Sequence, residues 1–434
     1  MLGEEGTSIL GLSESGLNVP ISTPHPLPIS PETVITAEAG LNLGALADLR
    51  AEPLVAVGDS VSQGAPILRD RRRSECIVTA PMSGRVAELE IGAGRRLASL
   101  VIHRDERDAR HDFETHAARE ELAGDGGSAA LRQLLQTAGL WMRLRARPFG
   151  CVPDGMASSA AIFVMAVDTR PLAPDPRLVL AGEELEKLEC GLRVLARLCT
   201  GPIYLCQGGR VPEIAVSHPQ VRIIRTGRLH PAGLAGTQIH RWSPARPDRV
   251  VWEIAVEDVV AIGHLLSNSR LPETRLVAVA GPGLRETRLV RCQPGADLRE
   301  LCYTHMSPGP RVILSGSVLE GREARWLGFR DRQVTVLERP DSAVPRHWLE
   351  AALRRASRAE PIIATAAVEQ ALGGAMPGMA LLRALSIGDD EAAVELGVLS
   401  LLEEDMALVD YVTAASPRFS DLLRASLDRI EANS

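Results

Sequence analysis

The spacing of hydrophobic residues changes several times along the chain, and each change predicts a different kind of structure. Residues 38–103 contain short stretches in which polar and apolar positions alternate, separated by turns at Gly58-Asp59 and Ser83-Gly84. Glycine reaches positive φ angles and aspartate hydrogen-bonds its own backbone, so both dipeptides favour hairpins. We therefore predict a small unit made of short β-strands at this end of the chain.

The period becomes helical from about residue 128. Residues 128–139 have leucines at helical spacing and end at Gly139, and residues 183–201 predict an amphipathic helix with an acidic first turn. Strands are expected at three apolar segments: residues 160–169, 202–206 and 221–225. The first segment is an almost unbroken apolar run, which is typical of a strand that is covered on both faces. This alternation predicts an open α/β layer over residues 140–260.

The remaining third of the chain first returns to short strands and then becomes helical. Residues 275–340 combine glycine and proline turns with one helix near 297–303, which predicts a small mixed sheet wrapped on a helix. Gly281-Pro282-Gly283 follows a strand, but Pro282 removes an N–H and Arg285 stands where a dinucleotide loop needs glycine, so we predict only a tight turn. Residues from about 345 onward are acidic and helical in pattern.

Composition narrows the classes of partner and cofactor. A chain of 434 residues is expected to divide into several domains, and its net charge of −7 argues against nucleic acid as a partner. No apolar stretch is long enough to span a bilayer and the start has no signal-peptide pattern, so we expect no direct membrane insertion and a cytoplasmic location. Lys187 is the only lysine, and the seven cysteines include no CxxC pair, which argues against iron–sulfur clusters and structural zinc.

One segment, GLWMRLRARPFGCVPDG at residues 139–155, places large apolar residues among Arg143, Arg145 and Arg147. Guanidinium groups and an aromatic ring could together hold a flat, electron-rich ligand. The three arginines could equally form the solvated face of a strand whose apolar residues enter the core. The residues alone leave both interpretations open.

Other candidate groups have structural interpretations. The segment LHPAGLAGTQIHRW contains His230, Gly233, Gly236 and His240; it lacks a third metal ligand, so we predict a shaped loop with buried imidazoles and no metal site. The remaining acidic residues of note are expected to be solvated or to cap helices: Glu257, Asp258, Asp389, Asp390, Glu403, Glu404 and Asp405.

Several segments, in order along the chain, resemble the A subunit of the sodium-pumping NADH:quinone oxidoreductase. They include GLNVPI, GDSVSQG with TAPMSGRV, GLWMRLRARPF, IFVMAVDTRPLAPDP, HPAGLAGTQIH, DVVAIGHL, AGPGLRETRLVR, LSGSVL and LLEEDMALVDYV. The resemblance implies an α/β multidomain fold with four parts: a barrel-sandwich (lipoyl-like) domain without its attachment lysine at 1–105, a Rossmann-like α/β domain without a nucleotide loop at 106–260, a soluble-ligand-binding β-grasp domain at 261–340 and a helical C-terminal domain at 341–434.

The resemblance also implies a function. It points to a peripheral subunit on the cytoplasmic face of the bacterial inner membrane that contributes to quinone reduction and complex assembly, with no flavin or iron–sulfur cofactor of its own and no catalysis alone. Its partners would be the membrane and flavin-bearing subunits. The alternative is a divergent paralogue that serves as a docking scaffold of another membrane redox complex.

The quinone-associated segments of the family correspond here to residues 42–49 and 144–151. The residues that the resemblance assigns to quinone are Leu46, Leu49, Leu144, Arg145, Arg147, Pro148, Phe149 and Cys151. If Arg147 and Phe149 contact quinone or a partner surface, replacing both by alanine should weaken quinone binding and leave the melting temperature nearly unchanged.

Overall fold

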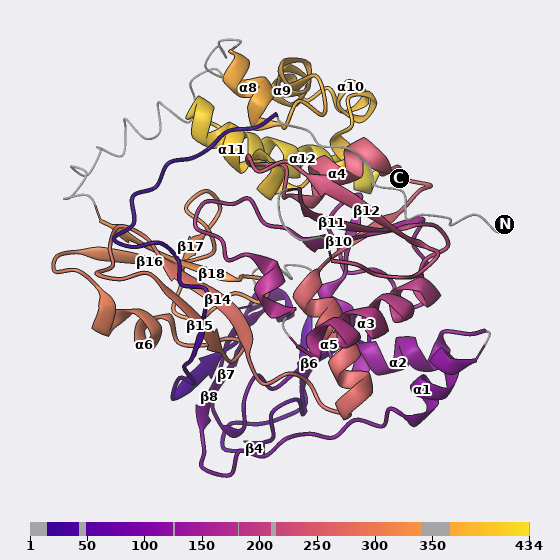
Figure 1. Cartoon of the computed structure of the whole chain (residues 1–434), viewed down its shortest axis with the longest axis vertical. Coiled ribbons are helices and arrows are strands. Elements are labelled where there is room, and N and C mark those ends of the chain that lie inside the picture. The colour runs from indigo at the N-terminus through magenta and orange to yellow at the C-terminus, as the bar shows by residue number, and fades with distance from the viewer. Residues whose placement is uncertain are drawn as a thin grey trace.

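The computed structural model describes residues 15–42, 49–124, 126–180, 182–209, 214–339 and 365–433. These residues form an α/β fold of several units, in which four sheets lie below a group of C-terminal helices as drawn in Figure 1. The expected helical segment HWLEAALRRASR and residue Leu46 lie outside the described residues. Within the described ranges, no helix is long and apolar enough to cross a lipid bilayer.

Two small sheets form the predicted all-β unit, and buried side chains of both sheets belong to one apolar core. Their orders are β2-β8-β7-β4 and β3-β5-β6, with antiparallel pairing throughout. The strands are β2 Glu38–Gly40, β3 Ala51–Pro53, β4 Ser60–Val61, β5 Pro66–Asp70, β6 Ile77–Thr79, β7 Gly84–Ile91 and β8 Leu97–Arg104. Ile67 and Leu68 of β5 pack with Leu100 and Ile102 of β8, which explains why these short strands are stable together.

The α/β layer is a five-stranded sheet of order β12-β11-β10-β13-β9, parallel except at β9. Its strands are β9 Arg145–Arg147, β10 Ala161–Ala166, β11 Ile203–Gly208, β12 Val221–Thr226 and β13 Val251–Ala255. Its helices are α1 His116–Ala123, α2 Ala129–Thr137, α3 Glu184–Leu198, α4 Ala235–Trp242 and α5 Val256–Asn268. In β10, Ile162 and Val164 pack in the core that contains α3 and α5, and Phe163 packs in the core that contains α4. Both faces of β10 are therefore covered by helices, which confirms the predicted reason for its apolar run.

Helices α3 and α5 lie unusually close together on one face of this sheet. A Cβ atom at Gly191 would overlap the backbone of Val259, and one at Gly263 would overlap the backbone of Lys187. The two glycines therefore let the helix backbones approach each other. Residue 260, the expected end of the second domain, lies inside α5. This helix packs within the α/β layer along its length.

The third unit is the expected mixed sheet, of order β1-β15-β14-β18-β16-β17. Its elements are β1 Glu32–Thr33, β14 Arg275–Ala280, β15 Arg288–Cys292, α6 Leu298–Cys302, β16 Arg311–Ser315, β17 Arg322–Glu323 and β18 Gln333–Glu338. The turn at residues 281–283 directly follows β14, as predicted. The edge strand β1 comes from the N-terminal segment, and Leu17 of that segment pairs with His230. Residues 15–33 thus run along units other than the first.

The C-terminal unit consists of helices around their own apolar core. They are α8 Ala366–Ala371, α9 Gly378–Ile387, α10 Asp390–Glu395, α11 Glu403–Thr413 and α12 Phe419–Ala432. Helix α11 lies above the α/β layer in Figure 1, and its N-terminus points its acidic residues toward the strands below.

Candidate functional site

A cavity of about 840 Å³ opens at the carboxyl ends of β10 and β13. The chain leaves β10 to one side, through α3 to β11, and later places β13 on the other side of β10. The strand order therefore reverses between β10 and β13, and ligands of open α/β sheets bind at such a reversal. Met165 and Asp168 at the end of β10 and Ile254 and Glu257 at the end of β13 all line the cavity.

All four units of the chain supply residues to the cavity wall, and Leu49 is one that comes from the all-β unit. The α/β layer contributes Arg145 and Phe149, the mixed sheet contributes Glu320 and Phe329, and α11 contributes Glu404. The apolar part of the wall includes Leu49, Met142, Phe149, Met165, Leu319 and Phe329. Charged side chains are numerous in the same wall, and apolar surface beside polar groups suits a ring with polar substituents.

The arginines of β9 are not a solvated strand face, so that interpretation is wrong. Arg145 lies opposite Glu253 in the antiparallel β9–β13 pair and contacts both Glu253 and Glu404. The Arg147 side chain is 0% exposed; its Nη2 lies 3.0 Å from Glu253 Oε2 and 3.5 Å from Glu404 Oε1. Its Nε donates to the carbonyl oxygen of Ser400 at 3.3 Å. Both guanidinium groups therefore already have carboxylate partners.

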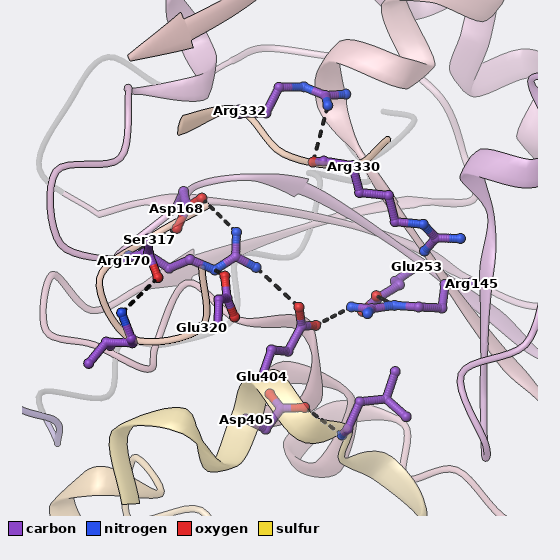
Figure 2. Close-up of polar contacts among 12 residues, drawn as sticks. Arg145, Asp168, Arg170, Glu253, Ser317, Glu320, Arg330, Arg332, Glu404 and Asp405 are labelled. Atoms are coloured by element: carbon purple, nitrogen blue, oxygen red, sulfur yellow. Dashed lines mark hydrogen bonds and ion pairs between the residues drawn. The ribbon is translucent and has the colours of Figure 1, made fainter. Parts of the chain in front are cut away.

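Arg170 connects this group to the mixed sheet, as Figure 2 shows. Its guanidinium lies 2.7 Å from Glu320 Oε1, 3.2 Å from Glu404 Oε2 and 3.1 Å from Asp168 Oδ2. Burial would raise the pKa of Glu404, but the guanidinium groups of Arg145, Arg170 and Arg147 outweigh it and hold that pKa well below its usual range.

Two other carboxyl groups of the cluster are shifted in the opposite direction. Burial raises the pKa of Glu320, and the negative charge of Glu404 adds to the effect despite Arg170. Burial likewise raises the pKa of Asp405, against Arg147 and together with Glu404. These groups hold protons at a pH where an exposed carboxyl group is ionised. The cavity wall therefore contains a protonated carboxyl group, that of Glu320, as well as charged side chains.

Residues 230–240 pack against this cluster, but the predicted loop is only half right, because residues 235–242 form α4 and place Gly236 and His240 on a helix. Gly236, the second residue of α4, lies so close to the carboxylate of Asp405 that a Cβ atom would overlap it. The Gly233 N–H donates to Thr169 Oγ1 at 2.9 Å, and His230 Nδ1 lies 3.3 Å from the same hydroxyl. The ring of His240 occupies the space where a side chain at position 397 would be. Among the described residues, no group of three His, Cys, Asp or Glu side chains is arranged to hold a metal ion.

A second charged group lies around Asp258 at the start of α5. Asp258 Oδ1 accepts from Arg332 Nη2 at 2.9 Å and lies 3.7 Å from Arg143 Nε and 3.8 Å from Arg275 Nη2. Glu257 contacts Arg332 as well. Two acidic residues therefore occupy the first turn of α5, a helix end that would otherwise favour an anion.

The expected surface or capping role is wrong for Glu257, Asp258 and Glu404 and right for the other four acidic residues. The first three are instead partners of buried or half-buried arginines, because strands and helices far apart in sequence meet at the cavity. Asp405 caps α11 by accepting from the Leu402 N–H at 2.8 Å, and it also lies 3.8 Å from Arg147. Asp389 caps α10 by accepting from the Ala392 N–H, and Asp390 binds Ser426 and Arg429. The side chain of Glu403 is about half exposed.

The structure brings four of the predicted quinone residues to the cavity: Leu49, Arg145, Phe149 and Cys151. Three others, Leu144, Arg147 and Pro148, are buried behind the wall. Asn42, at the start of the other predicted segment, also lines it. Two segments about a hundred positions apart therefore meet at one cavity.

The α/β layer, the mixed sheet and α11 contribute wall residues that the sequence analysis did not assign to a ligand site. Arg170, Glu320, Arg330 and Glu404 all line the cavity, and although Arg170 and Glu404 lie in segments that carry the family resemblance, nothing in their spacing points to this role. The available signal was the charge density of FRDR at residues 329–332, directly before a buried strand. Long-range packing places these side chains, so local pattern does not reveal them.

Phe149 has an unusual backbone at the edge of the cavity. Its φ angle is +78°, a region that a bulky residue rarely adopts. Its carbonyl oxygen accepts from Arg424 Nη1 at 3.1 Å and Nη2 at 3.0 Å. A side chain at the next residue, Gly150, would collide with Leu402. The C-terminal helices therefore hold the Phe149 loop in place.

Comparisons with known proteins show similarity along nearly the whole chain. Family models match three regions: the NqrA N-terminal barrel-sandwich hybrid domain over 13–105, the NqrA second alpha/beta domain over 127–271 and the NQRA C-terminal domain over 276–325. The A subunit of the Na(+)-translocating NADH-quinone reductase from Pasteurella multocida is 34% identical over 449 residues, covering 96% of this chain and 98% of the relative. Its counterpart from Pseudomonas aeruginosa is 36% identical over 411 residues, covering 87% and 89%.

One solved structure, an NAD+-reducing [NiFe]-hydrogenase in the air-oxidized state, matches at 16% identity and a TM-score of 0.39, covering 72% of this chain and 65% of that chain. This value is too low to support an argument about the site.

Proposed function

Because the chain belongs to the NqrA family, whose members form the A subunit of the Na+-translocating NADH-quinone reductase, we propose that it works within such a complex and that its central cavity receives the quinone headgroup. One observation carries the proposal. The two segments that sequence resemblance associates with quinone meet at a single cavity, although about a hundred residues separate them. That cavity lies at the reversal of strand order, where α/β sheets bind ligands.

The cavity has the size and composition that a quinone headgroup needs. Its volume of about 840 Å³ exceeds that of a single substituted ring, and Met142, Phe149 and Phe329 give it apolar surface. Arginine N–H groups suit the two carbonyl oxygens and the negative charge that develops on them during reduction. The carboxyl group of Glu320 holds a proton at the same wall.

The chain is further proposed to carry no flavin or iron–sulfur cofactor, so that electrons reach the quinone from partner subunits. Support comes from the acidic first turn of α5, where Glu257 and Asp258 would repel a flavin or nucleotide phosphate. Burial also raises the pKa of the Cys292 and Cys302 thiols to about 12, which disfavours thiolate ligands. The absorption spectrum of the purified chain tests this, because flavin or iron–sulfur bands would contradict it.

Filling the cavity tests the quinone proposal directly. Leu319 lies in the wall, and replacing it by tryptophan should weaken binding of a short-chain quinone to the purified chain at least tenfold by occupying the volume of the ring. Met156 is 77% exposed and lies outside the wall, so Met156→Trp is the matched control and should bind like the natural chain. Equal binding by both variants would place the quinone elsewhere.

A further inference from the structure

The two sides of the cavity differ in their balance of charge. On the side of α11, the guanidinium groups of Arg145 and Arg147 share Glu253 and Glu404, and Arg170 adds contacts to Glu320 and Glu404. Carboxyl groups here are at least as numerous as cations. This side therefore has no surplus positive charge for a ligand.

Cations are in excess on the opposite side. Asp258 is the shared partner of Arg332, Arg143 and Arg275, and Arg332 also contacts Glu257. Only Arg332 approaches Asp258 within hydrogen-bond distance, because the other two guanidinium groups lie 3.7 and 3.8 Å away. Two carboxylates, Asp258 and Glu257, therefore face three cations, and one positive charge is left over.

Arg330 has no carboxylate within 4 Å in the part of the chain that the structure describes. Its Nη2 donates to the carbonyl oxygens of Met142 and Leu144 at 3.0 and 3.2 Å, and its buried Nε has no hydrogen-bond partner there. The guanidinium lines the cavity, and Figure 2 shows it beside Arg145 and Glu253. Glu253 is already bound by Arg145 and Arg147.

The titration behaviour of these arginines agrees with the geometry. Burial, together with neighbouring cations, lowers the pKa of Arg330 and of Arg143 to about 10 and that of Arg275 to about 9. Positive charge is thus destabilised at these three arginines, and an added negative charge would relieve the imbalance. Arg332 differs, because burial lowers its pKa but Asp258 and Glu257 outweigh burial and raise it.

We propose that Arg330, with Arg143 behind it, forms an anion-binding subsite in the cavity wall that takes a negatively charged oxygen of an aromatic ligand. The apolar contacts for the ring come from Met142 and Phe329, which line the cavity next to the guanidinium groups. This proposal rests on the proposed function, because it assigns the charged end of the same cavity. It also assigns the contact with the ligand to Arg330 instead of Arg147, because the Arg147 side chain is fully buried and already paired.

Two quinones of nearly equal shape test the subsite on the purified chain. The ring hydroxyl of 2-hydroxy-1,4-naphthoquinone is ionised at neutral pH, whereas 1,4-naphthoquinone carries no charge. A hydrogen bond to a charged group is worth roughly one order of magnitude in affinity, so the hydroxyquinone should bind about tenfold more tightly. Arg330→Gln should abolish this preference, because it weakens binding of the ionised quinone more than binding of the neutral one, and Arg330→Lys should keep most of it.

The exposed Arg322 at the cavity rim provides the control for a general charge effect, and Arg322→Gln should keep the preference. If both quinones bind but the preference is absent, or survives in Arg330→Gln, the subsite is wrong and the proposed function stands. If neither quinone binds, the proposed function is wrong. The subsite is then tested by comparing the binding of benzoate, which carries a carboxylate, with that of benzamide, which is uncharged. Binding of benzoate that depends on Arg330 then supports the subsite, and its absence overturns it.

Discussion

Replacing Arg147 by alanine should strongly destabilise the α/β layer. The substitution leaves Glu253 and Glu404 with one fewer counter-charge in a place where the arginine side chain is 0% exposed. The closest pair, at 3.0 Å, has a Coulomb energy of about 5 kcal/mol at an effective dielectric constant of about 20. Loss of one partner of a buried pair typically costs about 3–5 kcal/mol, and we expect a loss in that range.

Tryptophan fluorescence during urea unfolding measures this loss where it arises. Trp252 pairs with Ala146, next to Arg147, and its ring lies 5.7 Å from that of Trp141. Both rings are fully buried, so opening of the sheet exposes them together. For a layer of this size, 3–5 kcal/mol corresponds to a melting temperature lower by roughly 10 °C.

Two further variants separate the buried network from a general effect of losing an arginine. Arg147→Ala combined with Glu253→Gln should recover part of the stability, because Glu253 is the carboxylate nearest to Arg147 and Arg145 keeps Glu404 as its partner. Arg322→Ala, at an exposed position, should change stability by less than about 0.5 kcal/mol. A loss below about 1 kcal/mol in Arg147→Ala would refute the reasoning and restore the expectation, made from sequence, of an unchanged melting temperature.

Two other predictions concern residues 230–240, which pack against the cluster of Arg145, Arg147, Arg170 and their carboxyl partners. Gly236→Ala should destabilise the chain by several kcal/mol, since its Cβ would overlap the Asp405 carboxylate, whereas Gly126→Ala, with nothing within 4 Å, should be nearly neutral; equal urea midpoints would contradict this. Burial, with Arg170 nearby, lowers the pKa of His230 to about 3, so the unfolded chain binds a proton below about pH 6.5 that the folded chain does not. Stability should therefore be fully present above pH 6.5 and fall as the pH is lowered toward 3, and His230→Asn should flatten this slope in urea unfolding from pH 4 to 8.

Local pattern was sufficient to predict the strands and helices but not the chemistry of the cavity. The apolar run at β10 and the amphipathic pattern of α3 follow from residues near in sequence, and both elements formed as expected. Glu404 instead belongs to a run of acidic residues that resembles an ordinary helix start. Its burial depends on Arg145, which is 259 positions away. Such pairing becomes visible only when the units are assembled.

The position of the arginines shows the same limit. Alternation correctly places Arg145 and Arg147 on one face of a strand, but it does not reveal that β13 lies alongside and brings Glu253 directly opposite Arg145. The antiparallel β9–β13 pair joins segments about a hundred residues apart. Whether a strand of arginines faces water, ligand or carboxylates is decided by that neighbour.

Photochemical labelling of the assembled complex tests the quinone assignment of the cavity most directly. A quinone analogue with a photoreactive group on its ring is bound to the complex, irradiated and located by peptide mass spectrometry. We expect labelling of this chain at the cavity wall, on peptides containing Met142–Cys151 or Leu319–Arg332, and its loss when unmodified quinone is in excess. Competed labelling confined to partner subunits, or to surfaces of this chain outside the cavity, would contradict the assignment.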